Sequence, residues 1–226
     1  ATTTGANNVF VGSDAGYTNV DGVRNIAVGQ QAFKLNSSGS YNTAVGRSAL
    51  YTNVSSNSNT AIGYESLYLS TGSNNTAVGF QAGDSTTGNH NTLIGSTAGA
   101  ALAGNSHCTI IGSEAGGTTT GGSNTFVGYR AGNDCTSGGS NVAIGYRALA
   151  DADVALTGVN ADASGDDVDY EIVIGINIAG AGADTFRVGK ASNYISTGSF
   201  SGAQTFTVSS DIRKKRNIND NTLGLE

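Results

Sequence analysis

The stretch Asn42–Leu50, with the sequence NTAVGRSAL, contains the pattern that decides the fold. Its first five residues fit the form Asn-x-x-(Val/Ile)-Gly, which recurs nine times between residues 8 and 145, once with Cys108 in place of asparagine. The glycines that close these motifs lie 16 or 17 residues apart, and alanine follows eight of the nine glycines after three residues. The chain therefore contains an internal repeat with a short, nearly constant period.

The length of the repeat predicts the fold class. A unit of 16 or 17 residues is too short for a helix pair or a propeller blade, but it suits one coil of a parallel β-solenoid. Stacked coils lie about 4.8 Å apart, so nine of them would form a rod about 40 Å long. We expect an all-β fold, a parallel β-roll or β-solenoid of nine coils, over residues 1–150.

The alternation of side chains along each strand predicts two faces. The residue before each glycine is always Val or Ile, and we assign its face to the inside of the coil. The opposite face is also apolar and mostly small. A strand that is apolar on both faces is normally covered on both sides, which favours copies of the same chain around a shared axis, three in number. The alternative is a single solenoid with an alanine-rich outer surface. The expected oligomer face consists of Phe10, Ala27, Ala44, Ala61, Ala77, Leu93, Ile110, Phe126 and Ala143.

The recurring asparagine and glycine have structural explanations. Stacked asparagines can form ladders of amide hydrogen bonds between coils, and asparagine tolerates tight turns. Glycine suits a bend where a Cβ would clash or φ is positive. Eight residues represent these repeat positions: Asn42, Gly46, Asn59, Gly63, Asn75, Gly79, Asn124 and Gly128.

Composition and charge exclude several functions. Charged residues make up only 12% of the chain and the net charge is −6, which argues against nucleic acid as a partner. No apolar run is long enough to cross a membrane. No phosphate-binding loop is present, and we expect no cofactor. Cys108 and Cys135 are expected to be isolated thiols, and with His90 and His107 they lack the spacing of a zinc site.

The repeat ends after Gly145, and residues 151–208 are expected to form a variant β neck region. The segment Asp151–Glu171 is acidic and without Lys or Arg. It is interpreted either as a solvated loop between coils or as a Ca²⁺ site, because hard cations bind clustered carboxylates. Strand signals then return. They cover Ile172–Gly175, Phe186–Gly189, Tyr194–Ile195 and Thr205–Val208.

Units such as NTAVGRSAL resemble the head repeats of trimeric autotransporter adhesins and related repeats of phage tail fibres. The resemblance covers roughly residues 5–150. It implies a left-handed parallel β-roll that assembles as a homotrimeric fibre.

The segment Ser209–Ile218 resembles the start of the intramolecular chaperone domain of endosialidase-type tail proteins, peptidase family S74. The motif falls on Ser210, Asp211, Arg213 and Lys215. The resemblance implies self-cleavage between Ser209 and Ser210, with Ser210 as nucleophile and Lys215 as base; a lysine base can activate a serine hydroxyl. Lys214 departs from the usual aliphatic residue. Residues 209–226 would be only the start of that domain.

These features together predict a structural and adhesive viral tail fibre that attaches to a host-surface glycan or protein. Its location would be the virion tail or an extracellular surface, and no turnover of an external substrate is expected. The alternatives are a bacterial trimeric adhesin head and a polysaccharide-degrading tailspike. An ice-binding solenoid would need an exposed, regular threonine array. Six regular threonines share the face assigned to the inside: Thr43, Thr60, Thr76, Thr92, Thr109 and Thr125.

Overall fold

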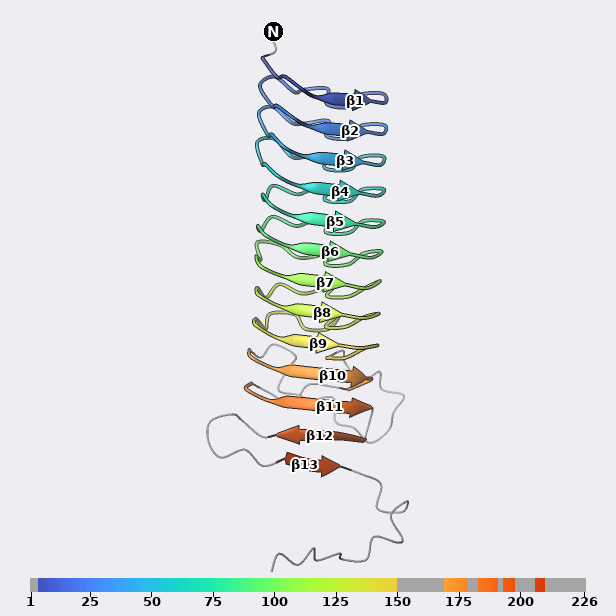
Figure 1. The fold of residues 1–226 in the computed structure, drawn as a ribbon, viewed down its shortest axis with the longest axis vertical. Coiled ribbons are helices and arrows are strands. Elements are labelled where there is room, and N and C mark those ends of the chain that lie inside the picture. The colour runs from blue at the N-terminus through green and yellow to red at the C-terminus, as the bar shows by residue number, and fades with distance from the viewer. Residues whose placement is uncertain (1–3, 150–168, 179–182, 191–192, 198–205, 210–226) are drawn as a thin grey trace, which may run out of the picture.

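The structure is a computed structural model that describes residues 4–149, 169–178, 183–190, 193–197 and 206–209. Within these ranges the protein is all-β and contains no helix. Thirteen strands lie side by side in one sheet, in the order in which they occur along the chain (Figure 1). The predicted fold class, a parallel β-solenoid of nine repeat coils, is confirmed.

The nine repeat motifs each form a three-residue strand. These strands are β1 Val9–Val11, β2 Ile26–Val28, β3 Thr43–Val45, β4 Thr60–Ile62, β5 Thr76–Val78, β6 Thr92–Ile94, β7 Thr109–Ile111, β8 Thr125–Val127 and β9 Val142–Ile144. The second part of the chain contributes β10 Ile172–Ile176, β11 Phe186–Lys190, β12 Asn193–Thr197 and β13 Phe206–Ser209.

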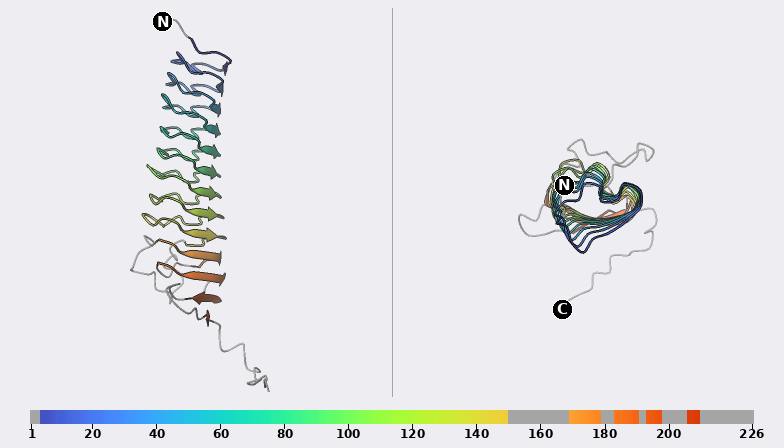
Figure 2. Two further views of the ribbon diagram at one scale, coloured as in Figure 1. Left: turned by 60° about the vertical axis from the view of Figure 1, so that its left-hand side comes forward. Right: turned by 90° about the horizontal axis from the view of Figure 1, so that it is seen from above.

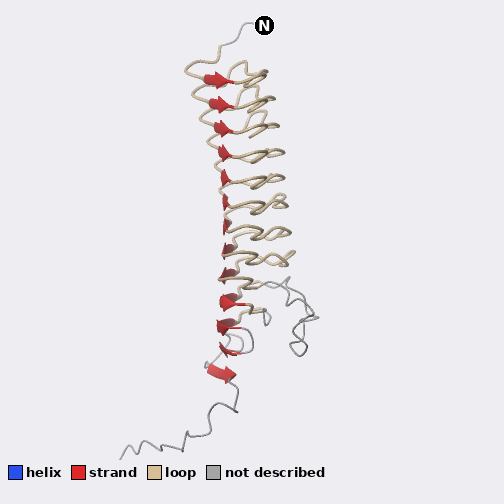
Figure 3. Ribbon diagram, turned by 90° about the vertical axis from the view of Figure 1, so that its right-hand side faces the viewer, coloured by secondary structure: helices blue, strands red, loops and turns tan. Residues whose placement is uncertain are grey.

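Equivalent residues of successive coils pair with one another. Ala44, for example, pairs with Ala27 on one side and with Ala61 on the other. Seen from above, the coils overlie one another, and seen from the side, the strands form one column with the loops behind it (Figures 2 and 3). Strands β1 to β11 are parallel, so β10 and β11 extend the stack beyond the nine repeats. The last two pairings, β11 with β12 and β12 with β13, are antiparallel.

Two positions face each other in the interior of each coil, one at the centre of the strand and one six residues later, beside the buried alanine that follows most repeat glycines. The sizes of the residues at these two positions are complementary. Phe126 lies in the same coil as Gly132, whereas Ala44 lies in the same coil as Leu50. The nine pairs are Phe10 with Gly16, Ala27 with Phe33, Ala44 with Leu50, Ala61 with Leu67, Ala77 with Gly83, Leu93 with Gly99, Ile110 with Gly116, Phe126 with Gly132 and Ala143 with Leu149. The fifth pair has two small members, and Leu67 and Leu93 from the adjacent coils approach Gly83 there.

The asparagine at the start of each coil ties three segments together through hydrogen bonds between its side chain and the backbone. The backbone N–H of Asn59 donates to Oδ1 of Asn42 at 2.9 Å, and the next coil repeats this bond from Asn75 to Asn59 at 2.9 Å. The Nδ2 of Asn59 donates to the Gly72 carbonyl at the end of its own coil, at 2.9 Å. These asparagines are buried, so their amides satisfy backbone groups that water cannot reach.

The repeat glycines allow coils to approach closely at the end of each strand. Gly46 has φ +133°, and a Cβ there would lie 2.3 Å from the Gly63 carbonyl oxygen of the next coil. Any other residue would therefore be strained and would also push the coils apart.

Candidate functional site

The outward face of the solenoid sheet is the candidate functional site. From β1 to β10, each strand turns its first and third residues away from the coil interior, and these residues are all β-branched. They are Val9, Val11, Ile26, Val28, Thr43, Val45, Thr60, Ile62, Thr76, Val78, Thr92, Ile94, Thr109, Ile111, Thr125, Val127, Val142, Ile144, Ile172 and Ile174. We call this set the β-branched face.

The side chains of this face are partly exposed to water in the single chain. Val11 is 56% exposed, Ile26 42% and Ile62 41%. The register keeps the two columns straight, because Thr43 pairs with Thr60 and Val45 with Ile62. The face carries no charged residue from β1 to β10.

The predicted assignment of the two faces was wrong. The residues expected to meet other copies of the chain lie inside the coil, where all but Phe10 are completely buried: Ala27, Ala44, Ala61, Ala77, Leu93, Ile110, Phe126 and Ala143. Phe10 is partly buried and packs against the same core. The physical reason is room: a coil of 16 or 17 residues is narrow, and its strand shares the interior with the side chain six residues later. Small alanines are therefore interior residues here.

The reversal changes which surface is available to a partner. The Val and Ile residues that precede the glycines, and the six regular threonines, are outside and accessible. The alternation within each strand could not distinguish the two faces, because the facing interior residue lies six residues later, in the turn.

The residues of the terminal motif, Ser210, Asp211, Arg213 and Lys215, lie outside the described residues. The proposed cleavage position follows Ser209, the last residue of β13. Self-cleavage by these residues stays a prediction.

Most of the acidic segment also lies outside the described residues. Of its described members, Asp169 accepts a hydrogen bond from the Gly139 N–H at 2.7 Å. Glu171 is buried in the asparagine column, and its Oε1 accepts a hydrogen bond from Thr185 at 2.9 Å. Among the described residues, no group of three or more His, Cys, Asp or Glu side chains is placed to hold a metal ion.

The cysteines and histidines do not form one cluster. Cys108 and Cys135 are buried thiols that form no disulfide, as predicted. Burial raises the pKa of the Cys108 thiol, which keeps it protonated and unreactive. His90 and His107 lie on the surface in adjacent coils, with stacked rings whose centroids are 5.3 Å apart.

Comparison with known proteins adds no family assignment. No protein-family model matches the chain, and neither the search of curated proteins nor that of solved structures finds a significant match. Within the part of the chain that the structure describes, no helix could span a membrane.

Proposed function

We propose that this chain is the shaft of a structural, adhesive fibre, and that copies of the chain assemble by burying their β-branched faces against one another. The observation that carries this proposal is the unbroken run of outward Val, Ile and Thr side chains from β1 to β10. A protein that stayed alone would leave this run in water along its whole length.

The size of the face supports a partner. Ten strands at about 4.8 Å each give a stripe about 45 Å long. Contiguous apolar patches beyond a few hundred Å² are rare on monomeric proteins and are typical of interaction sites. The face lacks the charged side chains that would keep two such surfaces apart. β-Branched residues are stiff, so ordering them at an interface costs little rotamer entropy.

The number of copies and the biological setting rest on the resemblance to trimeric adhesin heads and phage tail fibres. Three flat faces can close around a common axis, which leaves no face open and limits growth to a defined assembly. In this proposal the fibre attaches a virion tail to a host surface, and residues 209–226 belong to a self-cleaving chaperone segment that aids assembly.

Ile94→Lys tests the proposed interface. It places a charge in the middle of the β-branched face without touching the coil interior, so we expect the mass in solution to fall from three times 22.6 kDa to 22.6 kDa. Light scattering or native mass spectrometry gives the mass, and circular dichroism checks that the sheet remains.

Thr71→Lys is the matched control, because Thr71 lies exposed in a loop away from the strands. It should leave the mass unchanged. Ala77→Arg should instead unfold the coil, because Ala77 is completely buried. An unmodified chain of 22.6 kDa that is fully folded at high concentration would contradict the proposal.

A second candidate, ice binding, is favoured by one specific observation. Six threonines form a straight column on the outward side of β3 to β8, each paired with the next by the strand register. A rigid, regular array of methyl and hydroxyl groups is the kind of surface that could order water. Thermal hysteresis of a folded monomer would support this candidate, whereas a trimer without hysteresis would remove it.

A further inference from the structure

A second row of side chains runs along the edge where the repeat strands end. It consists of the residue after each repeat glycine: Ser13, Gln30, Arg47, Tyr64, Phe80, Ser96, Ser113, Tyr129 and Tyr146. Backbone hydrogen bonds between coils hold this row in register. The Thr97 N–H donates to the Phe80 carbonyl at 2.8 Å, and the next coils repeat the bond at Ser96 and Ser113.

Two stacked aromatic pairs occupy this edge. The rings of Tyr64 and Phe80 have centroids 5.3 Å apart and planes 7° apart, and those of Tyr129 and Tyr146 are 5.4 Å and 22° apart. The Arg47 guanidinium lies 5.4 Å from the centroid of Tyr64. Because stacked rings in adjacent coils are one coil apart, their faces point along the fibre.

The two pairs are separated by two coils that carry only serine at this position. The face of Phe80 that is turned away from Tyr64, and the face of Tyr129 that is turned away from Tyr146, therefore point toward the same serine gap, which we define by Ser96 and Ser113. Three strand spacings place these two ring planes about 14 Å apart. An aromatic contact takes about 4 Å, so the gap has room for two ring-sized groups, one against each aromatic face.

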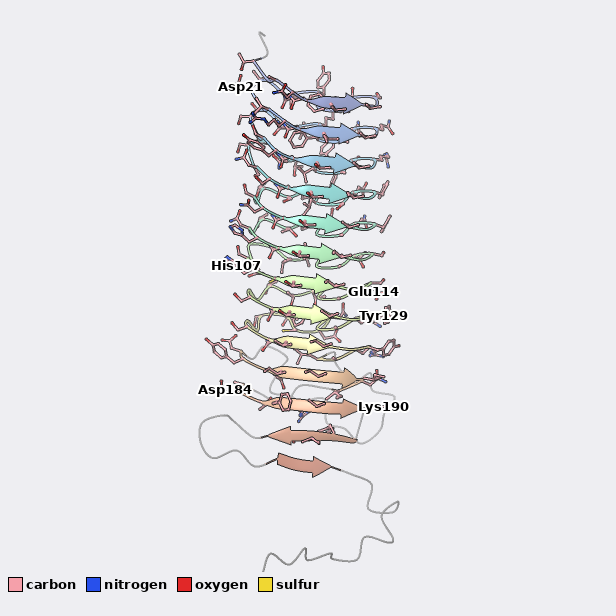
Figure 4. The ribbon with its side chains drawn as sticks, viewed as in Figure 1. Asp21, His107, Glu114, Tyr129, Asp184 and Lys190 are labelled. Atoms are coloured by element: carbon pink, nitrogen blue, oxygen red, sulfur yellow. The ribbon has the colours of Figure 1, made fainter. Side chains whose placement is uncertain are left out.

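The groups around the gap are polar and hydrogen-bonding. Glu114 lies at the same edge as Tyr129, as Figure 4 shows, and its carboxylate accepts a hydrogen bond from the Tyr129 hydroxyl at 3.5 Å. Arg130 pairs with Glu114 at 3.3 Å, which balances the local charge. Ser96 and Ser113 are the residues of this row in the two coils between the aromatic pairs. The surface thus combines two flat apolar faces with a rim of hydroxyl, carboxylate and guanidinium groups.

Exposure shows that these rings are not simply core residues. Phe80 has no polar group and is 49% exposed, and Tyr129 is 39% exposed. Aromatic side chains of this kind supply much of the binding energy of interaction sites, because they offer a large rigid area. The row lies at the ends of the strands, so the β-branched face can be buried without covering it.

We infer that this edge binds a neutral oligosaccharide, with one sugar ring against Phe80, one against Tyr129, and sugar hydroxyls hydrogen-bonded to the serines and to the Glu114–Arg130 pair. A pyranose has the matching chemistry: a flat face of C–H bonds for an aromatic ring and a rim of hydroxyls. The balanced local charge and the net charge of −6 disfavour an acidic glycan. A gap two coils wide is too small for a typical protein partner, which covers about 800 Å². The inference rests on the proposed attachment function and names its ligand class.

Saturation-transfer NMR on the complete chain tests this inference. The probes are short malto-, cello-, manno- and galacto-oligosaccharides, and at least one should receive magnetisation from the protein. Tyr129→Ser and Phe80→Ser each extend the natural serine gap and should weaken that binding by about tenfold or more. Tyr41→Ser is the matched control, because Tyr41 is 54% exposed at the opposite end of its strand; it should bind as the unmodified chain does.

Three results would overturn the inference: none of the four probes binds, Tyr129→Ser binds as well as the unmodified chain, or the Tyr41→Ser control loses binding equally. Circular dichroism of each variant separates loss of a contact from loss of the fold. Measuring the mass in parallel separates this inference from the assembly proposal. A trimer that binds no probe would contradict only the inferred sugar site. A monomer that binds a probe would contradict only the proposed assembly.

Discussion

At the scale of single residues, the asparagine column is interrupted at one position, Cys108. The Cys108 N–H still donates to Asn91 Oδ1 at 2.9 Å, but the thiol replaces the amide that the other coils use. Its Sγ lies 3.7 Å from the Gly121 carbonyl, whereas the amide of Asn124 lies 2.9 Å from the Gly138 carbonyl. A thiol is a weak donor and a weak acceptor, so the ladder is weakest here.

Cys108→Asn should therefore stabilise the protein. The new amide can donate to the Gly121 carbonyl and accept from the backbone of the next coil, and each hydrogen bond gained contributes about 1 kcal/mol. The measurement is the free energy of unfolding in urea. Asn59→Cys makes the reverse change within an unbroken part of the column and should destabilise the protein. Equal stability of Cys108→Asn and the unmodified chain would show that the ladder adds nothing at this coil.

At the scale of one coil, the strand and the turn that follows it share a fixed interior volume. A Cβ on Gly132 would lie 2.5 Å from the ring of Phe126, and one on Gly116 would lie 2.9 Å from Ile110. Leu50 fills the equivalent space in the coil of Ala44, where both side chains are completely buried. In eight of the nine coils, one large and one small residue therefore share this space, whichever side supplies the large one, and the exception is the coil of Ala77 and Gly83.

A double-mutant cycle on Phe126 and Gly132 tests this exchange. Phe126→Ala alone should cost about 3–5 kcal/mol by leaving a cavity, and Gly132→Leu alone should be destabilising because the added side chain would overlap the Phe126 ring. The double variant reproduces the natural pair of Ala44 and Leu50 and should recover most of the loss. Denaturant unfolding gives the coupling energy. Additive losses in the double variant would contradict shared filling of the coil.

The same exchange explains how far the sequence could predict the fold. The period of 16 or 17 and the glycine positions were enough to predict coils, parallel stacking and the strands near Ile172 and Phe186. Alternation with a period of two gives two faces but does not say which is inside. The interior partner of Ala44 is Leu50, six residues later in a turn, so it lies outside the strand pattern.

The left-handed turns were also beyond sequence reasoning, because unfavourable residues occupy them. Tyr41 has φ 61° and His107 has φ 64°. Residues other than glycine are uncommon in that conformation, tyrosine more so than histidine. Here a backbone hydrogen bond between coils holds each one, from Tyr41 to Val23 at 3.0 Å and from His107 to Asn89 at 3.1 Å. The row of residues that follow the repeat glycines was not predicted either. Its members have a regular position relative to glycine, but they vary in residue type.

At the scale of the whole molecule, the solenoid is a one-dimensional stack in which each strand pairs only with the strands of the adjacent coils. Stability then depends on the coils present and on which coils are adjacent. Removing one complete coil keeps every register position, so the remaining chain should still fold. The packing between the two coils that become neighbours determines how much stability is lost.

Deletion of residues 43–59 and deletion of residues 76–91 each remove one coil, but they should differ in stability. The first places the coil of Ala27 and Phe33 next to that of Ala61 and Leu67, two coils of the same kind. The second removes Gly83, which lies between Leu67 and Leu93: a Cβ on Gly83 would be 2.9 Å from Leu67 and 2.5 Å from Leu93. Without this spacer the two leucines would compete for one space, and overpacking of that kind costs about 1–3 kcal/mol.

We therefore expect the deletion of residues 76–91 to unfold at lower temperature and lower urea concentration than the deletion of residues 43–59, with both chains keeping the circular dichroism of a β-sheet. Equal midpoints for the two deletions would mean that the coils relax independently, and that the order of large and small interior residues along the solenoid has no energetic consequence.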